Sequence, residues 1–243
     1  MSELTDCLLT FDVDWAPDFV IESVAAMLRE RGLRSTWFVT HDTPALALLR
    51  ERADLFELAL HPNFLPGSTQ GGSPEQILAN VRSIVPEAVA FRTHAVVQSG
   101  PLLQMMMAAG LKVDSSVFLP GVEGIAPFEL HLAGRTLVRV PFIWADDYEL
   151  QLPNPCWARP PWPAGEGLKV LVFHPIYLRL NLADRTPYEA MKARRVPLSE
   201  WTESAVEPFV QPGEGAGTFF RRLIDGLAEA GPSRRLCDVA GID

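Results

Sequence analysis

The sequence of 243 residues predicts an α/β fold with a parallel sheet. Short apolar runs alternate with helical segments of about ten to fifteen residues, which is typical of parallel strands joined by right-handed crossovers. Hydrophobic residues make up 48% of the chain, enough to line the core of a compact unit of this length. We therefore expect a single domain over residues 1–243.

Each expected element depends on a local pattern. The apolar run 7–13 predicts a buried strand because Asp14-Trp15-Ala16-Pro17 ends it, and apolar residues at helical spacing predict a helix over 18–31. The same reasoning predicts, in order, strand 35–40, helix 43–52, strand 55–60, helix 74–84, strand 88–91 and helix 102–109. Beyond residue 111 we expect short strands at 130–132, 136–140 and 169–173, a helix at 217–230, a last strand near 235–239, and long loops at 153–167 and 186–217.

Charge and hydropathy exclude several classes of partner. Asp and Glu outnumber Lys and Arg by 30 to 21, and the net charge of −9 repels phosphate backbones. We therefore expect no nucleic-acid partner. No apolar run approaches the ~20 residues of a membrane-spanning helix, and the first residues are acidic where a signal peptide is basic. We expect a cytoplasmic protein without a membrane span.

Polar side chains follow four of the predicted strands. The carboxyl ends carry Asp12 and Asp14, then His61, then Arg92 with His94, and finally His174. Because the carboxyl ends of parallel strands meet at one edge of the sheet, these residues indicate an active site there. Period-two alternation puts Asp12 and Asp14 on one face, and two close carboxylates require a cation or a raised pKa. In the alternative interpretation, both carboxylates cap the following helix in water.

The ordered motifs resemble those of a known family. They are Thr10-Phe11-Asp12-Val13-Asp14, Leu60-His61-Pro62-Asn63-Phe64, Arg92-Thr93-His94, Pro141-Phe142-Ile143-Trp144-Ala145-Asp146-Asp147 and Leu171-Val172-Phe173-His174. Together they are similar to the polysaccharide deacetylase family, also called the NodB-homology domain or carbohydrate esterase family 4, and to its branch in bacterial surface-polysaccharide (O-antigen) gene clusters. The resemblance covers residues 8–174 and implies a distorted (β/α)7 barrel. Residues 175–243 would add the closing helices, strand and loops.

The resemblance also implies an activity, metal-assisted hydrolysis of an N- or O-acetyl group on a sugar. The cofactor would be one divalent metal ion, zinc before other ions, with Asp14 and His61 as ligands. Asp12 would be the general base, His174 the general acid, and Arg92 the residue that orients Asp12. The substrate would be an acetylated sugar, a sugar nucleotide or a lipid-linked glycan.

Further positions follow from the same resemblance. The backbone near Ala95 would help to bind the oxyanion. Trp144, with Asp146 or Asp147, would form a wall beside the catalytic groups. Four other aromatic side chains are available either to stack on sugar faces or to pack in the core: Trp157, Trp162, Tyr177 and Trp201.

The sequence departs from the family pattern at two positions. Leu65 stands where the family has the second histidine of His-x-x-x-His, so the third metal ligand would come from Gln70, Asn63 or His94. His94 itself stands where the family has proline, and it would contact substrate, contact metal or fill space.

These departures leave two other functions open. One is a related hydrolase of small amides, of the formyl or cyclic ureide type, on the same barrel. It would release formate or ammonia without acetate. The other is a carbohydrate-binding protein that kept the barrel and lost turnover. It would bind sugar without metal and without hydrolysis.

Overall fold

The computed structural model describes residues 6–159, 162, 165–231 and 233–242. Within them, one sheet contains β1 (Cys7–Asp12), β2 (Ser35–Val39), β3 (Phe56–Leu60), β4 (Ala90–Phe91), β5 (Val113–Asp114), β6 (Phe128–Leu132), β7 (Arg135–Arg139), β8 (Trp144–Ala145) and β9 (Lys169–Phe173). The strand order is β6-β7-β5-β4-β3-β2-β1-β9-β8, and every neighbouring pair is parallel except β6 with β7. The α/β class with a parallel sheet is confirmed.

The sheet curls into a distorted barrel because one extended segment of the chain pairs first with a strand at one side of the sheet and then with a strand at the other side. In residues 135–145, β7 pairs with β5 and β8 pairs with β9. Between them, Phe142 forms a parallel bridge with Phe118, which follows β5. When β7 and β8 are counted as one position, the barrel has seven strand positions, as the family resemblance implies. β6 is an additional antiparallel strand beside β7.

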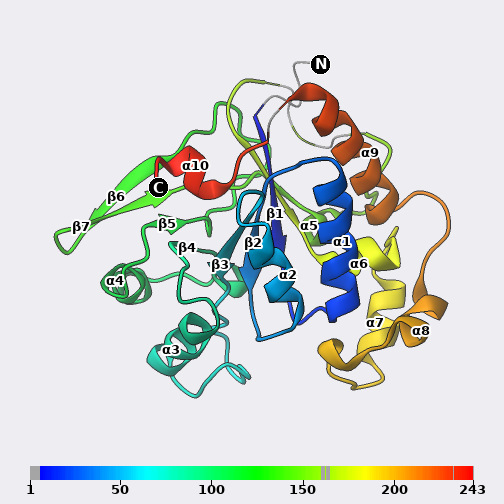
Figure 1. The fold of residues 1–243 in the computed structure, drawn as a ribbon, viewed down its shortest axis with the longest axis horizontal. Helices are drawn as coiled ribbons and strands as arrows, with labels where there is room; N and C mark the ends of the chain where they lie inside the picture. Colours follow the sequence, from blue (N-terminus) through cyan, green and yellow to red (C-terminus); the bar gives the residue numbers. More distant parts are fainter. Residues whose placement is uncertain (1–5, 160–161, 163–164, 232, 243) are drawn as a thin grey trace.

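Helices cover the outside of the barrel. They are α1 (Asp18–Glu30), α2 (Ala45–Glu51), α3 (Pro74–Ile84), α4 (Gly100–Ala108), α5 (Asp146–Glu149), α6 (Pro175–Leu180), α7 (Thr186–Lys192), α8 (Glu203–Val206), α9 (Ala216–Ala230) and α10 (Leu236–Ala240). Figure 1 shows α1, α6 and α9 together on one side of β1. The core continues from the sheet into this layer, because Phe11 on β1 stacks on Trp37 and meets Phe220 of α9 edge-on. No helix in the described part of the chain is long and apolar enough to cross a membrane.

The expected elements up to residue 109 are all present, with ends shifted by a few residues. The strand predicted near 235–239 is wrong, because Leu236–Ala240 is the helix α10. Its first turn is held by the Asp238 carboxylate, which accepts a hydrogen bond from the backbone N–H of Arg235 at 2.8 Å. The loop predicted over 186–217 is also wrong, since it contains α7, α8 and two short 3₁₀ turns. The loop predicted at 153–167 has no helix or strand among its described residues, and 160–161 and 163–164 lie outside them.

Candidate active site

The polar residues that follow the strands surround one cavity of about 450 Å³ at the carboxyl end of the barrel. Its walls include Asp12 and Asp14 after β1, Arg92 and His94 after β4, and His174 after β9. Parallel pairing brings these strand ends together although they are far apart in the chain. The hydrogen bond between Thr10 of β1 and Leu171 of β9, for example, joins residues that are 161 positions apart. The structure therefore brings these side chains together at one end of the barrel, where His61 also contacts Asp14, and their roles in a reaction stay predictions.

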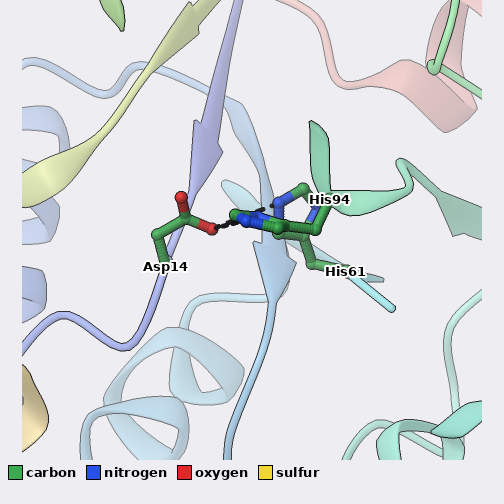
Figure 2. A group of neighbouring side chains, drawn as sticks. All are labelled: Asp14, His61 and His94. Atoms are coloured by element: carbon green, nitrogen blue, oxygen red, sulfur yellow. Dashed lines mark hydrogen bonds and ion pairs between the residues drawn. The ribbon is translucent and has the colours of Figure 1, made fainter. Parts of the chain in front are cut away.

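Asp14, His61 and His94 meet around one carboxylate oxygen. His94 Nδ1 lies 3.1 Å and His61 Nε2 lies 3.3 Å from Asp14 Oδ1, and Figure 2 shows both rings directed at this carboxylate. The other ring nitrogen of His61, Nδ1, donates to the carbonyl of Arg92 at 2.7 Å. This bond orients the ring so that Nε2 faces Asp14. The three residues therefore form a group able to hold a cation.

The backbone turns sharply where Asp14 leaves β1. Asp14 and Trp15 both have positive φ, 45° and 57°, in the left-handed region that residues other than glycine seldom adopt. The backbone N–H of Trp15 is held by Thr40 Oγ1 at 3.0 Å. Strain of this kind persists only where the surroundings enforce it, and here it accompanies the residue that contacts both imidazoles.

Asp12 and Arg92 form a buried ion pair beside this group. Arg92 Nη1 donates to Asp12 Oδ1 at 2.7 Å, and the rest of the guanidinium donates to the carbonyl and hydroxyl of Ser115. The rings of Phe38 and Phe142 lie against the guanidinium at 4.2 and 4.9 Å. Burial would raise the pKa of Asp12, but the charges of Arg92 and the nearby histidines outweigh it and lower the pKa. Asp12 is therefore ionised, with Oδ2 left free of Arg92.

His174, which follows β9, also lines the cavity and is paired with Asp146. His174 Nδ1 meets Asp146 Oδ1 at 2.6 Å, and the backbone N–H of His174 donates to Asp146 Oδ2 at 2.8 Å. Burial would lower the pKa of His174, but the charge and hydrogen bond of Asp146 raise it well above its ordinary value. The second ring nitrogen, Nε2, lies 3.5 Å from Asp14 Oδ2. The imidazole is thus held in one orientation, charged, with Nε2 toward the cavity.

Of the three residues proposed to replace the histidine missing at Leu65, two are engaged elsewhere. Gln70 donates to the carbonyls of Thr40 and His61 and accepts from the backbone N–H of Asn63. Asn63 Oδ1 accepts from the backbone N–H of Leu65. Both amides therefore shape the loop after β3, and the structure brings only His94 to Asp14.

The remaining expected residues divide between the cavity and the core. Asp147 lines the cavity, whereas Trp144 does not. Trp144 points into the outer aromatic layer, where it packs on Trp157 and Trp162 and donates to Glu149 Oε2 at 2.9 Å. Trp157 and Trp162 are thus packing residues, which decides between the two uses left open for them.

The sequence reasoning missed several side chains that α7 and α5 place in the wall of the cavity. Tyr188 and Lys192 from α7 and Tyr148 from α5 line the cavity, together with Arg185 just before α7. The signal was present in Thr186-Pro187, since proline in the first helical turn is a common start of a helix. Tyr188 and Lys192 stand four residues apart and therefore share a helix face.

Strand-end carboxylates, imidazoles and a buried arginine thus surround a cavity of a β/α barrel, and comparison with known proteins identifies the family. The family model of WbmS-like polysaccharide deacetylases matches residues 9–192. The chain belongs to this polysaccharide deacetylase family. No curated protein matches the sequence significantly.

Two solved structures extend the comparison. WbmS of Bordetella bronchiseptica, provisionally described as a polysaccharide deacetylase involved in O-antigen biosynthesis, is 30% identical, with a TM-score of 0.77 over 92% of this chain and 91% of that one. A protein of Mycobacterium smegmatis, provisionally described as a polysaccharide deacetylase, is 15% identical, with a TM-score of 0.57 over 98% of this chain and 90% of that one. The second similarity concerns the fold alone.

Proposed function

We propose that this protein is a metal-dependent hydrolase that removes an N- or O-acetyl group from a sugar or glycan intermediate. The observation that carries the proposal is the cavity whose wall contains Asp14 and His94 of the possible cation-binding group, together with a buried carboxylate, Asp12, and a charged imidazole, His174. Family membership supports the deacetylase reaction. The similarity to WbmS supports a substrate from surface-polysaccharide synthesis.

The chemistry and spacing of the three residues fit a divalent cation. Two imidazoles and one carboxylate are the three protein ligands of many catalytic zinc sites. Tetrahedral ligands at about 2.0–2.1 Å from an ion are about 3.3 Å apart, and both imidazoles approach Asp14 at 3.1 to 3.3 Å. His94 would thus take the place of the family's second histidine. When bound, a divalent cation polarises an acetyl carbonyl and makes water a better nucleophile.

The protein groups divide the proton transfers. Asp12 Oδ2 accepts a proton from the attacking water, because Arg92 holds Oδ1 and keeps the carboxylate ionised. His174 Nε2 donates a proton to the departing sugar nitrogen or oxygen as the bond to the acetyl carbon breaks, and Asp146 stabilises the imidazolium before this transfer. The products are acetate and a free amine or hydroxyl. Ala95 lines the cavity, and its backbone N–H would assist the oxyanion.

Metal content of the purified protein tests the proposal directly. We expect one divalent ion per chain, measured by mass spectrometry. Loss of a residue that only hydrogen-bonds a metal ligand lowers the affinity for the ion by about 10–100-fold. Because His94 is proposed to be a ligand itself, we expect a larger loss of affinity in His94→Ala. Acetate release from an N-acetylated oligosaccharide should stop on chelation and return with the ion.

The matched control is His131→Ala, because His131 is exposed on β6, is not among the residues that line the cavity, and pairs only with Glu129 and Thr136 among the described residues. It should keep both the ion and the activity. A wild-type protein that binds no ion, or a His94→Ala variant that binds it as tightly as wild type, would contradict the ligand set. Saturable sugar binding without acetate release would favour the carbohydrate-binding alternative.

A further inference from the structure

A second cavity of about 530 Å³ adjoins the catalytic cavity. The two share Asp14, Tyr188 and Lys192 in their walls. One side of the second cavity is formed by α7 and by residues 195–199 and 201, and the other by Trp15 and the loop after β3. In Figure 1, α7 and α8 lie beyond the carboxyl end of β1, on the side where the catalytic groups gather. We call this space the α7 cavity.

The α7 cavity carries positive charge in a chain whose net charge is −9. Lys192 and Arg195 line it, and neither forms an ion pair with any residue that the structure describes; Lys192 has only the ring of Tyr188 at 5.5 Å. The other nearby cation that lines the catalytic cavity, Arg185, is already paired with Glu189 at 3.0 Å. The charges of Lys192 and Arg195 are therefore available to a ligand.

Asp14 is the only acidic residue among those that line the α7 cavity. The Asp14 carboxylate contacts His61 and His94 and forms no ion pair with Lys192 or Arg195, so it does not neutralise these two cations. The remaining wall is largely apolar and aromatic, with Trp15, Tyr188 and the buried side chains of Met191 and Trp201. Aromatic rings beside cations suit a sugar that carries an anionic group, since the ring binds the apolar face and the cation binds the charge.

We propose that the α7 cavity binds an anionic group, a carboxylate or a phosphate, on the part of the substrate next to the acetylated sugar. The inference builds on the proposed deacetylase function and specifies its substrate class as acidic or phosphorylated glycans. Lys192 and Arg195 are the specificity-determining residues. They act on substrate selection and take no part in proton transfer.

A set of matched probes tests this inference. The neutral probe is chitotetraose with N-acetyl groups. The carboxylate probe is a hyaluronan tetrasaccharide, and the phosphate probe is N-acetylglucosamine 1-phosphate. We expect kcat/KM for at least one anionic probe to exceed that for the neutral probe. In Arg195→Gln we expect this ratio to fall about tenfold, the effect of losing one charge-assisted hydrogen bond. Lys192→Gln should lower it similarly.

Arg135→Gln is the matched control. Arg135 is exposed on β7, next to the edge strand β6, and its loss changes the net charge equally without touching either cavity. The ratio should stay at its wild-type value. Calorimetric binding of the two anionic probes gives a second measurement that needs no turnover. It should weaken with salt and in Arg195→Gln.

The outcomes separate the two proposals. Acetate release from all three probes with equal kcat/KM, or anion binding that Arg195→Gln leaves unchanged, overturns the anion site and leaves the deacetylase function intact. Anion binding that Arg195→Gln weakens, without acetate release from any probe, supports the anion site and counts against the deacetylase function. Preference for hyaluronan or for the sugar phosphate identifies the anion as carboxylate or phosphate.

Discussion

The two ends of the barrel each bury a carboxyl group and surround it differently. At the carboxyl end, Asp12 on β1 is paired with Arg92 at 2.7 Å and faces a cavity. At the amino end, Glu57 on β3 accepts hydrogen bonds through Oε2 from Thr36 Oγ1 at 2.7 Å and from the backbone N–H of Cys237 at 3.2 Å. Glu57 Oε1 has no hydrogen-bond partner among the described residues.

The pKa values of the two carboxyl groups shift in opposite directions for this reason. Burial acts on both, but only Asp12 has a guanidinium in direct contact, so its pKa is lowered while that of Glu57 is raised. Glu57 instead fastens the C-terminal segment, together with Thr36, whose hydroxyl accepts from the backbone N–H of Leu236 at 3.0 Å. Glu57 also borders a cavity, so a cavity alone does not mark catalysis, and a buried carboxyl is a sign of it only where a counter-ion keeps the group charged.

The largest expected difference between the two ends is in activity. Asp12→Asn should lower kcat about 10²–10⁴-fold, because the amide cannot accept the proton of water. Glu57→Gln, at the other end, should keep the wild-type kcat. Acetate release under saturating substrate measures both, with circular dichroism to verify folding. A kcat within twofold of wild type in Asp12→Asn would remove Asp12 from the mechanism.

Removal of the counter-ion should have the largest effect on stability. Arg92 is 1% exposed, and Arg92→Met leaves the buried Asp12 carboxylate without its guanidinium partner, with His61 at 3.6 Å, which should cost about 3–5 kcal/mol in the free energy of unfolding. The double variant Asp12→Asn/Arg92→Met should lose less than the sum of the single variants, since no charge is left buried. Urea denaturation of the four proteins measures the coupling. Strict additivity would show that the pair does not interact.

The smallest effect is a dependence of stability on pH at the amino end. The pKa of Glu57 is raised in the folded protein, so its contribution is fully present below the ordinary value of 4.5 and is lost as pH rises through the folded-state pKa. Glu57→Gln should therefore be more stable than wild type by about 1 kcal/mol at neutral pH, and the difference should disappear toward pH 4. Thermal unfolding across this range tests the sign. Greater stability of wild type at neutral pH would show that Glu57 is ionised and favourably paired.

The sequence predicted the strands that carry the polar site residues well, because the signals for these strand ends are local. Each of Asp12, His61, Arg92 and His174 directly follows an apolar run, and a strand end can be read from neighbouring residues alone. The third cation ligand could not be chosen in this way. Gln70, Asn63 and His94 were equal candidates until the fold of the loop after β3 engaged the first two amides with backbone groups.

The C-terminal third was predicted less well. Residues 235–239 were expected to form a strand, yet Leu236–Ala240 is the helix α10, because Asp238 caps its first turn and Thr36 and Glu57 bind its backbone N–H groups. Those two partners lie about 180 to 200 residues away in the chain, so no local pattern reports them. Likewise Trp144, expected beside the substrate, faces the outer layer because α9 offers Phe219 as a packing partner.

The sequence by itself determined the parallel α/β sheet, the strand ends that carry the polar residues, and the chemical types gathered there. These follow from periodicity and chain order, which need only short-range information. Only the tertiary structure decided which histidine joins Asp14 and His61, which aromatic residues pack, and that Lys192 and Arg195 border the site. Those outcomes depend on distances between residues far apart in the chain, and such distances are fixed when the core closes around the buried pair of Asp12 and Arg92.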